Sequence, residues 1–304
     1  IDGGKPNSIG IPRSVRVAHV HLAKQVPTFE TCAGTGAPEQ RLAEQDQDGI
    51  DCEILFSQIT FVLRQTKDDD FYKDCIRAYN EFLGEQYMAA APDRLVCMGT
   101  LPTTGVDDAI KEMAHCARLG MKGVKLDRYP SGKSYPTPAD DKFWAAALDM
   151  NIALTNHNNG NMGSGKGEPD YLYPKDPGHD VHQKDAFKFF TRFSNDAMTA
   201  TMQMAFAGVW DRFPKLQFYW AETMIGCLEY DLWHIHDHYK RYMGMIHEAW
   251  GLPKLDRMPS EYLKDRNYWG FLRDPVGLKR RAAIGYDKIM WGTDFAHAAS
   301  EFPN

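Results

Sequence analysis

The stretch LVCMGTLPTTGVDDAIKEMAHCARLGMKGVKL, residues 95–126, contains the two kinds of element from which the fold is built. Residues 95–101 are a short apolar run that predicts a strand, and residues 107–118 have the spacing of a helix, closed by Gly120. Residues 123–126 predict the next strand. A strand, a helix and a strand in this order are typical of a parallel sheet with crossover helices.

The same alternation continues outward in both directions along the chain. Further strands are predicted at residues 15–20, 52–56, 152–155, 216–221, 268–272 and 289–291. Further helices are predicted at residues 69–91, 143–150, 185–213 and 226–247. The pattern predicts an α/β protein, a distorted (β/α)8 TIM barrel that forms one catalytic domain over residues 1–304. A doubly wound open sheet is the alternative, but the Gly-rich phosphate loop that it normally carries is missing from the sequence.

Composition indicates which partners and which cellular location to expect for this protein. The net charge of −6 and the absence of a basic run argue against a nucleic-acid partner. No stretch approaches the roughly 20 apolar residues that cross a bilayer, and no signal pattern precedes Pro12. Six scattered cysteines indicate reduced thiols, so we expect a cytoplasmic protein. Because the chain begins without Met and ends directly after the last predicted strand, we expect segments to be missing at one or both ends.

Metal-capable side chains stand at the ends of four predicted strands. In barrels of this kind, functional side chains cluster at the carboxyl ends of the strands. A divalent ion held by imidazoles and carboxylates lowers the pKa of bound water from 15.7 to around 7, and a nearby carboxylate or imidazole can move its proton. The candidates are His19, His21, His157, Glu222, Asp294 and His297. The two imidazoles of the first strand face the same side, because residues two apart in a strand do so.

Several longer motifs resemble the second amidohydrolase family of the amidohydrolase superfamily, which also contains aminocarboxymuconate-semialdehyde decarboxylase and γ-resorcylate decarboxylase. The motifs most specific to this family are GVWDRFPKLQFYWAE (208–222) and MWGTDFAHAASEFP (290–303). The stretch RLAEQDQDGIDCEILF (41–56) also resembles the family. The resemblance implies a TIM barrel that usually binds one divalent ion, often zinc. It makes His157 and Asp294 metal ligands.

Two departures from the family pattern affect the expected site. Glu222 stands where many members carry a histidine, so the role of moving a proton passes to Glu222 or to His297. His297 matches the histidine of the family's GTDFPH, with Ala296 in place of proline. The HxH pair His19 and His21 resembles the first-strand ligands of short members; otherwise the true motif precedes Ile1.

From these residues we expect a metal-dependent hydrolase that cleaves an amide, ester, lactone or related C–N or C–O bond of a small cyclic or aromatic molecule. Zinc is the expected ion, with iron or manganese as alternatives. Asp294 and Glu222 are the candidate bases, His297 orients the substrate or acts as acid, and Lys125 binds substrate or forms an ion pair. A non-oxidative decarboxylase of an aromatic or unsaturated acid is the first alternative. A metal-free barrel that acts as a binding protein is the second.

Two further features have modest interpretations. His234, His236 and His238 resemble a metal cluster, but only the first and third share a helix face, so an exposed helix surface is expected. The long helices and the aromatic-rich segments at 239–250 and 262–271 leave room for a homodimer face.

Overall fold

A computed structural model of the chain describes residues 36–57, 59–63, 66–157, 162 and 196–295. The predicted first strand at residues 15–20 lies outside these ranges. The chain divides into two compact units: Ile1–Met98 with Gly292–Asn304, and Gly99–Trp291.

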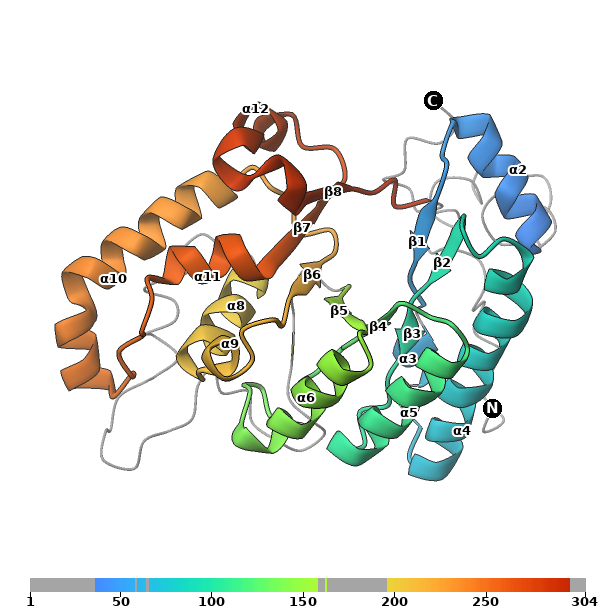
Figure 1. Cartoon of the computed structure of the whole chain (residues 1–304), viewed down its shortest axis with the longest axis horizontal. Coiled ribbons are helices and arrows are strands. Elements are labelled where there is room, and N and C mark those ends of the chain that lie inside the picture. Colours follow the sequence, from blue (N-terminus) through green and yellow to red (C-terminus); the bar gives the residue numbers. More distant parts are fainter. Residues whose placement is uncertain (1–35, 58, 64–65, 158–161, 163–195, 296–304) are drawn as a thin grey trace, which may run out of the picture. The chain divides into compact units, whose positions relative to one another are not determined.

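The first unit contains a short parallel sheet and helices (Figure 1). Its elements are α2 (Pro38–Asp48), β1 (Glu53–Leu55), α3 (Ile59–Leu63), α4 (Asp69–Glu81), η1 (Phe82–Tyr87), η2 (Met88–Ala90) and β2 (Leu95–Cys97). β1 pairs in parallel with β2, from Glu53 opposite Leu95 to Leu55 opposite Cys97. Helix α2 has Pro38 in its first turn and is capped at its C-terminus by Gly49, whose φ of 69° is left-handed.

The helix predicted over residues 69–91 is α-helical only as far as Glu81. Asp68 caps its start, because the carboxylate accepts the N–H groups of Asp70 and Phe71. The chain then passes through a π-helical turn, η1, and a 3₁₀ turn, η2. Phe71 and Phe82 are exposed, and the buried face of α4 contains Tyr72 and Ile76.

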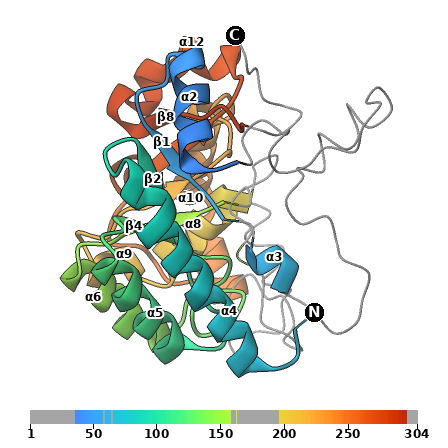
Figure 2. The ribbon, with the colours of Figure 1, turned by 90° about the vertical axis from the view of Figure 1, so that its right-hand side faces the viewer.

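The second unit is built on a six-stranded, wholly parallel sheet in chain order, β3–β4–β5–β6–β7–β8. The strands are β3 (Gly99–Thr100), β4 (Gly123–Lys125), β5 (Ala153–Asn156), β6 (Phe218–Trp220), β7 (Asn267–Phe271) and β8 (Ile289–Trp291). The helices are α5 (Val106–Arg118), η3 (Pro138–Asp140), α6 (Asp141–Asp149), α8 (Asp196–Phe206), α9 (Val209–Arg212), α10 (Leu228–Trp250), α11 (Pro259–Arg266), α12 (Pro275–Ile284) and η4 (Tyr286–Lys288). Helices α5 and α6 lie side by side (Figures 1 and 2). The predicted alternation of parallel strands and helices is confirmed over the described residues.

One long helical region of the sequence is broken. Residues 196–213 form α8 and α9, because Gly208 adopts a left-handed φ of 64° between them. Residues 185–195 of the same predicted helix lie outside the described ranges. Every residue of α8 after Asp196 is buried except Thr199, which is partly buried, in agreement with the alanine- and methionine-rich sequence of the helix.

The strand register sorts side chains onto the two faces of the sheet. Successive residues of a strand alternate between faces. A buried apolar face contains Leu154, Phe218 and Trp220, and the Trp220 indole donates a 2.7 Å hydrogen bond to Asn267. The opposite face carries a row of paired polar residues: Thr100, Lys125, Thr155, Tyr219 and Tyr268.

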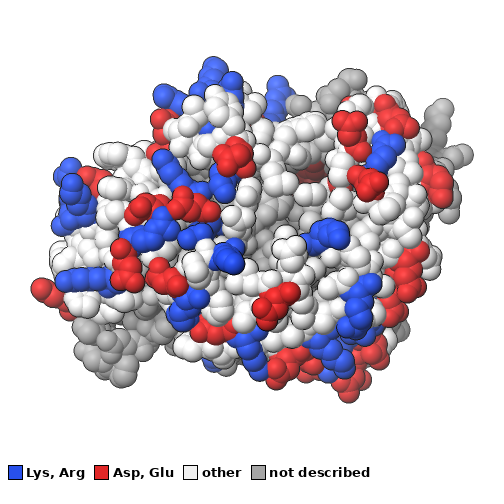
Figure 3. All heavy atoms as spheres, in the orientation of Figure 1, with Lys and Arg blue, Asp and Glu red and all other residues white. Residues whose placement is uncertain are grey.

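Other features agree with the composition. No described helix is long and apolar enough to cross a membrane. Cys52, Cys75, Cys97, Cys116 and Cys227 are free thiols. On the face drawn in Figure 3, positive and negative side chains are interspersed.

Candidate functional site

His157 directly follows β5, at a strand end fixed on both sides. Asn156 is fully buried, and its side-chain amide donates a 2.8 Å hydrogen bond to the carbonyl of Leu126, beyond β4. The carbonyl of Asn156 accepts the N–H of Ala221, beyond β6, at 3.0 Å. These bonds hold the end of β5 between its two neighbours, so the position of the His157 backbone is well determined.

Glu222 meets His157 from the next strand. Nε2 of His157 and Oε1 of Glu222 lie 3.1 Å apart, within hydrogen-bonding distance, with side chains 14% and 27% exposed. In a continued strand, Glu222 would point to the same face as Trp220, away from the polar row. Its backbone is instead left-handed, with φ of 58°, and this conformation breaks the alternation. The His157–Glu222 pair therefore depends on an uncommon backbone conformation at Glu222.

Two neighbouring groups from β7 and the segment after it build this turn. The carbonyl of Gly270 accepts the N–H of Met224 at 3.1 Å. Gly270 also has no side chain where β6 ends: a Cβ there would lie 2.8 Å from the backbone nitrogen of Glu222 and 3.0 Å from Cα of Ala221. A side chain at position 270 would displace the backbone that carries Glu222.

Asp274 anchors the remainder of the turn. One carboxylate oxygen accepts the N–H groups of Ile225 at 2.7 Å and Gly226 at 2.6 Å, and the other accepts the N–H of Gly277 at 2.8 Å. Asp274 is thus both the N-cap of α12 and the acceptor for the loop after β6. The start of α12 and the loop that follows Glu222 are tied to one buried carboxylate.

Tyr219 belongs to the same neighbourhood and was missed by the sequence analysis. A Cβ on Gly270 would lie 2.7 Å from the Tyr219 hydroxyl, so this hydroxyl occupies the space that the glycine leaves open. Burial, followed by the negative charge of Glu222, raises the pKa of Tyr219 to about 12. The phenol therefore stays protonated at neutral pH and can donate a hydrogen bond. Its position two residues before Ala221 on β6 was visible in the sequence, but its approach to Gly270 requires the strand register.

Lys125 ends β4 one strand away from β5. Its ammonium group lies 3.1 Å from Oδ1 of Asp127, and its side chain is only 4% exposed. The ion pair that was one of the two expected roles is present, and substrate binding by Lys125 stays a prediction.

The remaining predicted ligands are distributed over different parts of the chain. Asp294 belongs to the first unit, is half-buried and has a left-handed φ of 53°. His19, His21 and His297 lie outside the described residues. Within the described ranges, no group of three or more His, Cys, Asp and Glu side chains gathers at one point. The complete ligand set thus stays a prediction.

The histidines of α10 correct one expectation. His234 and His238 do share a helix face, with ring centroids 3.8 Å apart. His234 is buried rather than exposed, because Tyr230 stacks on it from one turn before and His238 covers it from one turn after. Burial and the neighbouring His234 lower the pKa of His238. His236 is exposed and bonds Ser260 at 2.8 Å.

The chain is similar to known proteins in both sequence and structure. The chain is 22% identical over 185 residues to 2-amino-3-carboxymuconate-6-semialdehyde decarboxylase of Dictyostelium discoideum; the match covers 60% of this chain and spans about half, 47%, of that relative. A solved 5-carboxyvanillate decarboxylase from Sphingomonas paucimobilis is 20% identical, with a TM-score of 0.62 over 86% of this chain and 74% of that one. A second, from Novosphingobium aromaticivorans in complex with manganese and 4-hydroxy-3-methoxy-5-nitrobenzoic acid, is 18% identical, with a TM-score of 0.64 over 95% and 80%.

These similarities confirm the predicted fold class, the distorted (β/α)8 barrel of the amidohydrolase type. The profile of the family described as Amidohydrolase matches residues 18–303 and so covers nearly the whole chain. This match includes the strand ends that carry His157, Glu222 and Asp294. The chain belongs to the amidohydrolase family.

Proposed function

We propose that the protein is a divalent-metal-dependent, non-oxidative decarboxylase of an aromatic or unsaturated carboxylic acid. The observation that carries the proposal is the His157–Glu222 pair at the carboxyl ends of β5 and β6, 3.1 Å apart. The three relatives named above are decarboxylases, which favours this activity over the hydrolysis that the sequence analysis put first.

The donor chemistry of the proposed ligands fits a divalent ion, because imidazole nitrogen and carboxylate oxygen are groups that bind zinc and manganese. Glu222, 3.1 Å from Nε2 of His157, would lie beside the ion without being one of its ligands. In the proposal, His157 and Asp294 hold the ion, with His19 and His21 from the N-terminal segment. When bound, the ion supplies a positive charge that fixes and polarises the substrate carboxylate or an adjacent oxygen.

Decarboxylation requires a proton at the carbon that loses CO₂. The C–C bond breaks, its electron pair stays on that carbon, and the carbon takes a proton from the enzyme. We assign the proton to an oxygen of Glu222, which a left-handed backbone turns toward His157 and away from the apolar face. The buried ammonium of Lys125, held by Asp127, adds positive charge that favours an anionic substrate. The neutral hydroxyl of Tyr219 is a hydrogen-bond donor beside Glu222.

The test combines metal analysis with a carbon dioxide assay. Purified protein is reconstituted with Mn²⁺ or Zn²⁺ and assayed for CO₂ release from 5-carboxyvanillate, 2,6-dihydroxybenzoate and related acids. We expect release from at least one of them and a loss of about 100-fold or more in kcat for Glu222→Gln, with metal content unchanged. His157→Ala should lose the metal.

Glu229→Gln is the matched control, because this glutamate on α10 pairs with Arg280 at the surface and should keep full activity. Product formation from esters, lactones or amides without CO₂ would restore hydrolysis as the better function. A folded protein that binds neither ion would favour the metal-free binding protein.

A further inference from the structure

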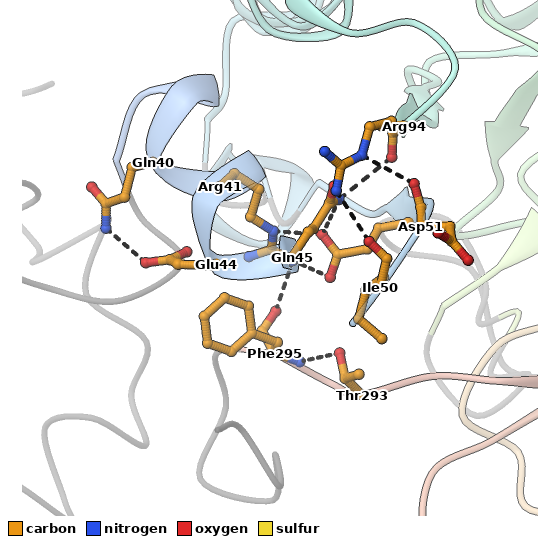
Figure 4. A network of polar contacts seen from close by, with 10 residues as sticks. Gln40, Arg41, Glu44, Gln45, Ile50, Asp51, Arg94, Thr293 and Phe295 are labelled. Atoms are coloured by element: carbon orange, nitrogen blue, oxygen red, sulfur yellow. Dashed lines mark hydrogen bonds and ion pairs between the residues drawn. The ribbon is translucent and has the colours of Figure 1, made fainter. Parts of the chain in front are cut away.

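The segment that carries Asp294 is attached to the rest of its unit through the next residue. Residues 292–295 follow β8, and Asp294 has a left-handed backbone. The N–H of Phe295 donates to the hydroxyl of Thr293 at 3.2 Å, and the carbonyl of Phe295 accepts from Nη2 of Arg41 at 3.4 Å (Figure 4). Both backbone polar groups of Phe295 are thus hydrogen-bonded, one of them to the side chain of Thr293.

Arg41 contacts Phe295 in a second way as well. Its guanidinium carbon lies 4.6 Å from the centroid of the Phe295 ring, the geometry of a cation–π contact. One flat cation therefore binds both the ring and the backbone carbonyl of the residue that follows Asp294. Two attachment points restrict rotation of this residue more than one would.

The guanidinium of Arg41 is itself held in place by the carboxylate of Glu53. Arg41 is only 6% exposed, and its Nε and Nη2 atoms lie 2.7 and 3.1 Å from the two carboxylate oxygens of Glu53. Glu53, on β1, also accepts a 2.8 Å hydrogen bond from Gln45, which lies one turn after Arg41 on α2. A carboxylate that accepts two hydrogen bonds from a guanidinium fixes the plane of that group. The ammonium group of a lysine is not planar and cannot form this paired contact.

We propose that Arg41, aligned by Glu53, is a positioning residue that sets the backbone of residues 293–295 and thereby aims the Asp294 carboxylate at its metal ion. This inference rests on the proposed function, in which Asp294 binds the ion. The motif RLAEQDQDGIDCE then contributes to the site through its first and last residues, although neither touches the ion.

The chain offers a control within the same network. Arg94 is bonded to Asp46 at 2.8 Å and to the carbonyls of Ile50 and Asp51 at 3.1 and 3.2 Å. These contacts link α2 and the loop after it to the turn directly before β2. Arg94→Lys therefore perturbs the packing of the same unit through groups that precede β1 and do not include residues 293–295.

The experiment measures Mn²⁺ affinity directly, by the loss of the free-ion electron paramagnetic resonance signal on titration of metal-free protein. We expect the dissociation constant to rise at least tenfold in Arg41→Lys and in Phe295→Leu. It should stay within twofold of the wild-type value in Arg94→Lys. Circular dichroism and thermal unfolding establish that each variant is folded, and Phe295→Leu keeps the Arg41–Glu53 pair if Arg41→Lys fails to fold.

Three outcomes separate the possibilities. If Asp294→Asn loses Mn²⁺ but folded Arg41→Lys and Phe295→Leu bind as tightly as the wild type, the metal site stands and the positioning role is wrong. If Arg94→Lys weakens binding as much as Arg41→Lys, Arg41 acts only through general stability and the inference is wrong. A wild-type protein that binds neither Mn²⁺ nor Zn²⁺ would overturn the proposed function, and the role of Arg41 with it.

Discussion

Replacing Gly270 by alanine tests how closely the end of β6 is packed against β7. The new Cβ would lie 2.7 Å from the Tyr219 hydroxyl, 2.8 Å from the nitrogen of Glu222 and 3.0 Å from Cα of Ala221. The hydroxyl is the end of a side chain and can move. The other two atoms are backbone, so the residue that carries the proposed proton donor must shift.

The magnitude follows from the chemistry of overpacking. Inserting a methyl group into a packed interior without space typically costs about 1–3 kcal/mol. For domains of 150–250 residues, each kcal/mol lowers the melting temperature by roughly 2–4 °C. We expect Gly270→Ala to unfold several degrees below the wild type. Its kcat should fall more than its stability suggests, because the shift separates Glu222 from His157.

The assay is thermal and urea unfolding alongside the CO₂ assay, with Gly244→Ala as the control. Gly244 is an exposed position inside α10, and a Cβ there meets nothing within 4 Å. Replacing a glycine by alanine inside a helix stabilises the helix by about 0.5–1 kcal/mol, so this variant should melt slightly above the wild type. The two substitutions are chemically identical and should act in opposite directions. If Gly270→Ala retained wild-type stability and activity, the close approach of β7 to Glu222 would not be a constraint.

Three further substitutions or reagents probe other features. Asp274→Ala should lower the free energy of unfolding by about 3 kcal/mol, since three backbone N–H groups lose their acceptor; a urea midpoint near the wild-type value would contradict this. The pKa of Tyr219 is raised in the folded state, so the neutral phenol stabilises the fold below pH 10, and this contribution is lost as the pH rises toward 12. Between pH 10 and 12 the free energy of unfolding of Tyr219→Phe should therefore fall by less than that of the wild type, with a difference of up to about 2 kcal/mol. Cys97 is buried with its pKa raised to about 12, so at pH 8 a thiol reagent should label exposed Cys52 quickly and Cys97 only on unfolding.

Hydrophobic alternation predicted the elements of the fold well, because each parallel strand is short and apolar. The strand predicted at 268–272, for example, is the five-residue β7, Asn267–Phe271. The run at 95–101 is divided between two sheets: the N–H of Met98 still bonds the carbonyl of Leu55, whereas Gly99 pairs with Val124. A sequence pattern identifies a strand but does not say which neighbours share it.

The site was predictable only where strand ends determine it. His157 and Glu222 were expected because each follows an apolar run, and they are neighbours in space. Their contact depends on a left-handed residue at 222, which no propensity favours for glutamate. Tyr219 and Gly270 were missed because only the register of β6 and β7 brings them together. Long-range geometry, rather than local pattern, decides these details.

The left-handed conformations of Glu222, Met224 and Asp294 have a consequence for the evolution of the protein. Each side chain makes its conformation less favourable, by an amount on the order of 1 kcal/mol, and glycine would relieve that strain. A laboratory selection for heat resistance alone would therefore favour glycine at 222 and 294, and would discard the two carboxylates that the proposed chemistry requires. Met224→Gly would give a similar gain without this loss. At positions 222 and 294, a substitution that stabilises the fold would remove a group needed for the proposed activity. At position 224, the same kind of substitution would stabilise the fold without that loss.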